Sequence, residues 1–84
     1  MKQKTIDMLK AKAAAYEAAA QADTAYADGY REVASMFLEI LGRADDMSPL
    51  DFADHASRAV FAAYQWEDTM GPDAFVPEYQ YDTP

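Results

Sequence analysis

Cysteine is absent from this 84-residue chain, glycine occurs three times, and there is a single histidine. Without cysteine the chain can form neither disulfides nor thiolate metal clusters, which favours a reducing, intracellular setting. Three glycines are too few for a glycine-rich phosphate-binding loop. Charged residues interrupt every apolar run near the N-terminus, so no signal peptide or membrane-spanning helix is predicted. We therefore expect a single-domain cytoplasmic protein without membrane contact.

Catalytic and metal-binding groups are equally scarce. His55 follows Asp51 by four residues, which would bring a carboxylate and an imidazole onto one helix face. However, neither Ser48 nor Ser57 lies in a nucleophile motif. The acidic residues around His55 lack the spacing of EF-hand, di-iron or zinc-helix sites. We expect no enzymatic activity, no cofactor and no bound metal.

Basic residues are few and unevenly placed. The chain has seven Lys and Arg against 15 Asp and Glu, a net charge of −8. Four of the seven are lysines within residues 1–12, and from Asp45 onward Arg58 alone opposes the acidic residues. Such a field repels nucleic acid and attracts basic protein surfaces. Ordinary solubility is the alternative explanation for the excess of acid.

The apolar pattern predicts three helices, over about residues 5–26, 30–41 and 49–70. In the first, large apolar residues are sparse and alanine dominates, with a predicted inner face of Ile6, Leu9, Ala13, Tyr16 and Ala20. A turn is expected at Asp28–Gly29, because glycine destabilises a helix interior. Whether the first two helices are continuous stays open.

The second predicted helix has an apolar stripe and a glycine at its end. The stripe contains Tyr30, Val33, Phe37, Ile40 and Leu41, widened by Met36 and Leu38. Gly42 is expected to end the helix in a left-handed conformation. Tyr30, Ala34 and Phe37 resemble the start of the second helix of a tetratricopeptide repeat. The resemblance covers some 15 residues and no second copy follows, so it implies one helical hairpin.

The third predicted helix has clear start and stop signals. Ser48 precedes Pro49, which gives an N-cap followed by proline at the first helical position. Gly71 and Pro72 would end the helix. Two apolar stripes lie on it: Leu50, Ala53, Ser57, Val60, Phe61 and Tyr64, and beside them Phe52, Ala56, Ala59, Ala63 and Trp66. Together these signals predict an all-α fold, a small three-helix bundle in residues 1–71.

Residues 72–84 form an acidic, aromatic segment that we expect to be extended, because its prolines oppose helix. One interpretation is that its aromatic side chains fold back over the bundle. The other is that some of them face a partner, together with neighbouring carboxylates. The predicted partner-binding residues are Asp45, Asp46, Asp51, Asp54, Trp66, Glu67, Asp68, Asp73, Glu78, Tyr79, Tyr81 and Asp82. Alternatively, Trp66 and the tail tyrosines belong to the core.

In size, acidity, helical character and lack of cysteine, the chain resembles the small acidic phage-encoded inhibitors that imitate nucleic acid, including anti-CRISPR and anti-restriction proteins. The resemblance implies that carboxylates on a rigid scaffold occupy a basic, nucleic-acid-binding surface of a partner protein in a bacterial host cell. The predicted partner-binding carboxylates would then replace phosphates. The lysine-rich start should lie away from that partner.

A second hypothesis is a structural or adaptor module that self-associates, with no target related to nucleic acid. Close-packed alanine faces suit such a contact, and two-fold dimers are the commonest oligomers. The alanine-rich first helix would supply the contact between copies, so a homodimer is a possible state of this protein.

Overall fold

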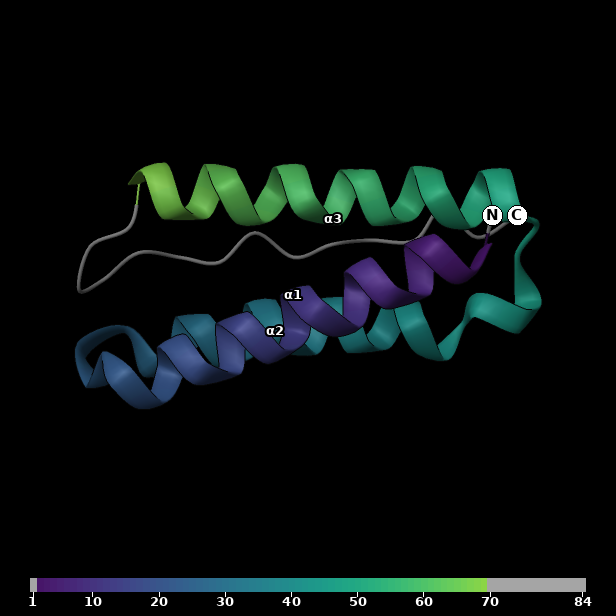
Figure 1. Cartoon of the computed structure of the whole chain (residues 1–84). Coiled ribbons are helices and arrows are strands. Elements are labelled where there is room, and N and C mark those ends of the chain that lie inside the picture. Colours follow the sequence, from purple (N-terminus) through teal and green to yellow (C-terminus); the bar gives the residue numbers. More distant parts are fainter. Residues whose placement is uncertain (1, 70–84) are drawn as a thin grey trace.

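The computed structural model describes residues 2–69, which form a three-helix bundle without strands in that range (Figure 1). The helices are α1 (Lys2–Ala22), α2 (Ala27–Gly42) and α3 (Pro49–Thr69). Two single-turn 3₁₀ segments connect them, η1 (Thr24–Tyr26) and η2 (Ala44–Asp46). The all-α prediction is thereby confirmed for the described range. The predicted extended segment 72–84 lies outside the described residues.

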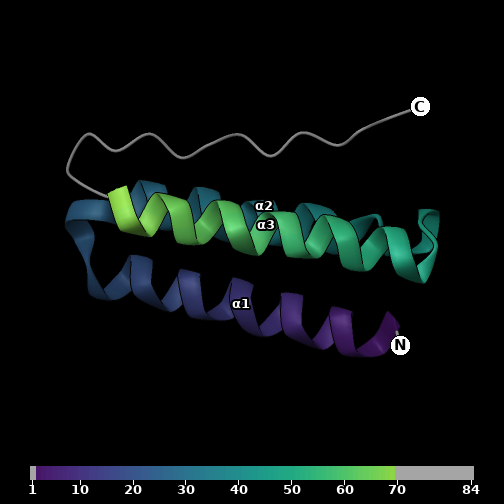
Figure 2. The same cartoon turned by 90° about the horizontal axis from the view of Figure 1, so that it is seen from above.

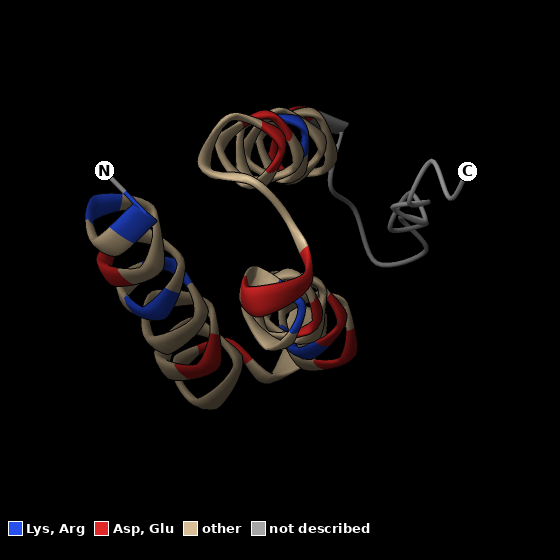
Figure 3. Ribbon diagram, turned by 90° about the vertical axis from the view of Figure 1, so that its right-hand side faces the viewer, with Lys and Arg blue, Asp and Glu red and all other residues tan. Residues whose placement is uncertain are grey.

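The three helices run up, down and up. α1 and α2 form an antiparallel hairpin, and α3 lies alongside both, antiparallel to α2 (Figures 1 and 2). Viewed along the bundle axis, the three helices occupy the corners of a triangle (Figure 3). This topology places η1 at the same end of the bundle as the last turns of α3. The other end combines the start of α1, η2 and the start of α3.

Large side chains and alanines share the core. The largest fully buried side chains are Trp66, Phe37, Phe52, Leu9, Ile40 and Val33. Buried alanines from all three helices fill the remaining contacts and allow close approach of the backbones. Leu9, Ala13, Tyr16 and Ala20 are buried as predicted for the first helix.

The predicted turn at Asp28–Gly29 is wrong, since α2 already begins at Ala27. The chain reverses earlier, at Asp23, whose side chain accepts a hydrogen bond from the backbone N–H of Ala25 at 3.2 Å. Gly29 is helical, and the indole ring of Trp66 packs directly against the position where a Cβ atom would lie. A glycine in this turn therefore makes room for the largest core side chain.

The predicted boundaries of α3 agree better with the structure. The Ser48 hydroxyl accepts a hydrogen bond from the backbone N–H of Asp51 at 3.2 Å, which confirms the N-cap. Gly42, by contrast, does not end α2 in a left-handed conformation, because no described glycine has a positive φ. The backbone N–H of Arg43 instead closes the last turn on the carbonyl groups of Ile40 and Leu41.

Candidate functional site

One of the two apolar stripes of α3 faces the core, whereas the other is mixed, since Ala53 and Val60 are half-buried and its larger side chains are exposed. Phe52, Ala56, Ala59, Ala63 and Trp66 are buried, whereas Leu50, Phe61 and Tyr64 are exposed at 79%, 62% and 50%. The exposed stripe recurs at helical spacing and consists of Leu50, Asp54, Ser57, Phe61, Tyr64 and Asp68. The outer face of α3 thus presents apolar and acidic side chains together.

Trp66 does not present its ring on this outer face. Its side chain is 1% exposed and makes an edge-on contact with Tyr30, with ring centroids 5.2 Å apart. The prediction that Trp66 forms part of an exposed aromatic patch is therefore wrong, and Trp66 belongs to the core. The tail tyrosines of the same alternative lie outside the described residues. Its neighbours Glu67 and Asp68 are exposed, because successive helical residues differ by about 100° in direction and these two therefore lie outside the buried stripe.

The six predicted partner-binding carboxylates within the described range do not form one patch. Asp45 and Asp46 lie in η2, and Asp51 and Asp54 in the first turns of α3, all exposed at one end of the bundle. Glu67 and Asp68 lie at the other end. A helix rise of 1.5 Å per residue separates the two groups by roughly 25 Å. The other predicted partner-binding residues, Asp73, Glu78, Tyr79, Tyr81 and Asp82, lie outside the described residues.

The end that contains η2 has mixed charge. The lysine-rich start of α1 lies there, on the helix next to η2 and α3 (Figures 1 and 3). Asp54 additionally forms an ion pair with Arg58, with Nη2 and Oδ2 2.9 Å apart. Positive and negative groups balance at this end, so Asp45 and Asp46 do not stand in a uniformly acidic field.

The opposite end is acidic, and we call it the acidic pole. The three helices and Asp23, the N-cap residue of η1, contribute carboxylates to it: Glu17, Asp23, Asp28, Glu32, Glu67 and Asp68. Within residues 2–69, the cation at this end is Arg31, which pairs with Asp28 at 3.2 Å. Four of these carboxylates come from positions 17–32, so a charge count along the chain could not group them with Glu67 and Asp68.

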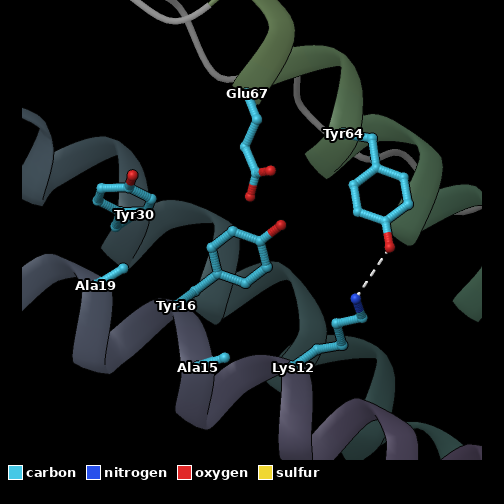
Figure 4. Close-up of a pocket in the computed structure, with 7 residues that line it drawn as sticks. All are labelled: Lys12, Ala15, Tyr16, Ala19, Tyr30, Tyr64 and Glu67. Carbon is cyan, nitrogen blue, oxygen red and sulfur yellow. Dashed lines mark hydrogen bonds between the residues drawn. The ribbon is translucent and has the colours of Figure 1, made fainter.

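A groove opens between α1 and α3 beside the acidic pole (Figure 4). Its volume is about 520 Å³, and it is lined by Lys12, Ala15, Tyr16, Ala19, Tyr30, Tyr64 and Glu67. The Glu67 carboxylate points from α3 toward Tyr16 and Tyr30. On the other side, the Lys12 ammonium donates a hydrogen bond to the Tyr64 hydroxyl at 3.1 Å.

The pKa values of two tyrosines in the groove, Tyr16 and Tyr30, are raised. Burial raises the pKa of the Tyr16 hydroxyl above its ordinary value of 10.0, and the adjacent Glu67 carboxylate raises it further. Burial also raises the pKa of Tyr30, with smaller contributions from the charges of Asp23 and Glu67. Like any tyrosine, both are protonated and can donate hydrogen bonds at neutral pH, and the raised pKa values keep them protonated further into the alkaline range.

Neither a candidate metal site nor a membrane-spanning helix is found in the described range. No group of three or more His, Asp or Glu side chains in residues 2–69 is arranged to hold a metal ion. None of the helices described here is long and apolar enough to cross a bilayer.

Comparisons with known proteins give no relative. No protein family matches the chain, and neither a curated protein nor a solved structure shows significant similarity to it.

Proposed function

We propose that this protein is a small acidic inhibitor that occupies a basic, nucleic-acid-binding surface of a partner protein in the cytoplasm of a bacterial cell. The supporting observation is the acidic pole, where six carboxylates and one cation, Arg31, lie at one end of the helical bundle. Lysine and arginine side chains that normally contact phosphates would pair with these carboxylates. An antagonist of host defence, such as an anti-CRISPR protein, would act in this way without catalysis.

Exposed aromatic side chains would add specificity to this electrostatic attraction. Phe61 and Tyr64 lie on the outer face of α3, and Tyr64 also borders the groove next to Glu67. Aromatic residues are frequent anchors of protein interfaces, because they bury a large area at low entropic cost. In this proposal Phe61 and Tyr64, and not the buried Trp66, supply the aromatic contact with the partner.

Two double variants with equal charge change test the proposal. Glu32→Lys with Asp68→Lys reverses charge at the acidic pole, whereas Asp45→Lys with Asp46→Lys reverses it at the mixed end. Tagged wild-type protein and both variants are used to capture proteins from a bacterial lysate, and circular dichroism checks helix content. We expect wild type and the mixed-end variant to retain a basic protein that high salt or competing duplex DNA releases, and the pole variant to lose it. Equal capture by both variants would refute the proposal.

Self-association is the second candidate, and a different surface favours it. Ala11, Ala14, Ala15, Ala18 and Ala22 are exposed on one side of α1. Small residues let two helices approach closely, so this alanine stripe could pair with a second copy. Light scattering on wild type and Ala18→Glu distinguishes the two: a dimer that Ala18→Glu converts to a monomer supports an assembly module.

A further inference from the structure

We infer that the groove between α1 and α3 is a receptor for an arginine side chain of the basic partner, with Glu67 as its anion and tyrosine rings as its walls. This inference rests on the proposed function, because it identifies which partner group enters the site. A guanidinium has five N–H donors in a plane and both pairs with carboxylates and stacks on aromatic rings. The groove offers acceptors and rings for each of these contacts.

Two charged side chains, Lys12 and Glu67, lie in the groove. Lys12 already donates to the Tyr64 hydroxyl at 3.1 Å. Glu67 is exposed, and within residues 2–69 no ion pair engages its carboxylate. The Lys12 ammonium keeps its positive charge and also lies 5.1 Å from the centre of the Tyr64 ring, so the groove has a cation on its Tyr64 side and an anion, Glu67, on its Tyr16 and Tyr30 side. An incoming cation is attracted to the Glu67 side, where the neighbouring acidic pole adds to the negative field.

Aromatic rings line much of the groove. Tyr16, Tyr30 and Tyr64 come from three different helices and surround the space below Glu67 (Figure 4). Tyr16 is fixed from behind by Phe37, with ring centroids 5.7 Å apart, and Tyr30 by Trp66. Cations bind over such rings, and desolvation strengthens the contact. A preformed wall of this kind loses little entropy when a side chain enters.

The groove is large enough for an arginine side chain. A volume of about 520 Å³ lies in the range of pockets that hold small ligands. Ala15 and Ala19 form the α1 side of the groove, where larger residues would fill it. The space accommodates a long side chain together with adjoining peptide backbone, as docking of a partner requires.

A peptide titration tests this assignment without the partner. The probe is a blocked Gly-Arg-Gly peptide, and blocked Gly-citrulline-Gly is its uncharged isostere. Backbone amide shifts of the ¹⁵N-labelled protein are followed as each peptide is added. We expect the arginine peptide to produce saturable shifts centred on Ala15, Tyr16 and Ala19, with affinity on the order of millimolar. The citrulline peptide should produce none.

Variants of the lining residues sharpen the test. Glu67→Gln should weaken binding of the arginine peptide by about tenfold or more, as expected for loss of one charge-assisted contact. The matched control is Asp68→Asn, which removes the neighbouring exposed carboxylate outside the groove and should change affinity little. Lys12→Met removes a like charge and should strengthen binding.

Three results would overturn the inference. The citrulline peptide could bind as well as the arginine peptide, or the amide shifts could occur near the acidic residues of both ends of the bundle. Glu67→Gln and Asp68→Asn could also weaken binding equally. The outcome is separable from that of the proposed function. If the acidic-pole variant loses the captured basic protein but the arginine peptide does not bind, only the assignment of the groove as an arginine receptor is refuted. If the arginine peptide binds but both charge-reversal variants capture the same proteins, the inhibitor proposal is refuted and the groove is still a cation site.

Discussion

Gly29 lies inside α2, where its lack of a side chain makes room for the indole ring of Trp66. Its position in α2 faces the Trp66 indole, where an added Cβ would also lie 3.1 Å from Cη2 and 3.2 Å from Cε2. A glycine usually signals a break in a helix. Here it is retained inside the helix because a distant side chain occupies the space.

Gly29→Ala should destabilise the protein although alanine favours helix. The gain of about 1 kcal/mol in helix propensity is outweighed by displacement of Trp66, since overpacking a core costs about 1–3 kcal/mol. Gly42→Ala is the control, because no atom lies within 4 Å of its added Cβ and its φ is not positive. Urea denaturation should show lower stability for Gly29→Ala and equal or higher stability for Gly42→Ala. A loss at Gly42 would instead support a left-handed cap there.

Tyr16 should make the folded state sensitive to alkaline pH. Its pKa is raised above 10.0 in the folded protein, by burial and then by Glu67. Above about pH 10 the unfolded chain therefore loses the phenolic proton first, and stability falls as pH rises. Tyr30 acts in the same direction. Urea midpoints measured between about pH 9 and pH 11 should fall less steeply for Tyr16→Phe than for wild type. Coincident slopes would contradict the assignment.

Among the elements, α3 has the most local determinants. Replacing Ser48 with alanine removes the acceptor for the Asp51 N–H and should cost about 1 kcal/mol. Ser57→Ala is a matched control, since Ser57 is exposed in the middle of the same helix. Chemical denaturation should place Ser48→Ala below wild type and Ser57→Ala at or above it. Equal stabilities of the two variants would show that the cap is dispensable.

Local signals explain how much of each element could be predicted. The start of α3 was predictable because Ser48 and Pro49 act within one turn. The start of α2 was not, because the reason for Gly29 is Trp66, far along the chain. The choice between the two stripes of α3 was also out of reach. Both have helical spacing, and only packing against α1 and α2 decides that Phe52 is buried and Phe61 exposed.

For the whole molecule, topology decides where charge accumulates. The up-down-up arrangement brings Glu17, Asp28 and Glu32 next to the end of α3, a juxtaposition that no local pattern indicates. The predicted partner-binding carboxylates of the described range are therefore divided between the two ends of the bundle. Glu67 and Asp68 belong to the acidic pole, whereas Asp45 and Asp46 share an end with lysines.

The acidic pole should destabilise the isolated protein. Carboxylates of like charge repel one another, and salt screens that repulsion. Glu32→Lys should therefore raise the free energy of unfolding by up to about 1 kcal/mol at low ionic strength, and with it the melting temperature. This gain should shrink in high salt. Asp45→Lys, at the mixed end, should give no such gain. Thermal melts at two salt concentrations compare the variants, and equal responses would argue against a concentrated pole.

The contact between Gly29 and Trp66 also equips the protein with an optical reporter. Trp66 is the single tryptophan of the chain, so emission excited at its red edge arises from one indole between α2 and α3. Tyr30 touches that indole and at the same time lines the groove. A ligand bound in the groove, or separation of α3 from the α1–α2 hairpin, should therefore change the emission maximum or the intensity of Trp66 fluorescence. Both events can be followed in the unlabelled protein.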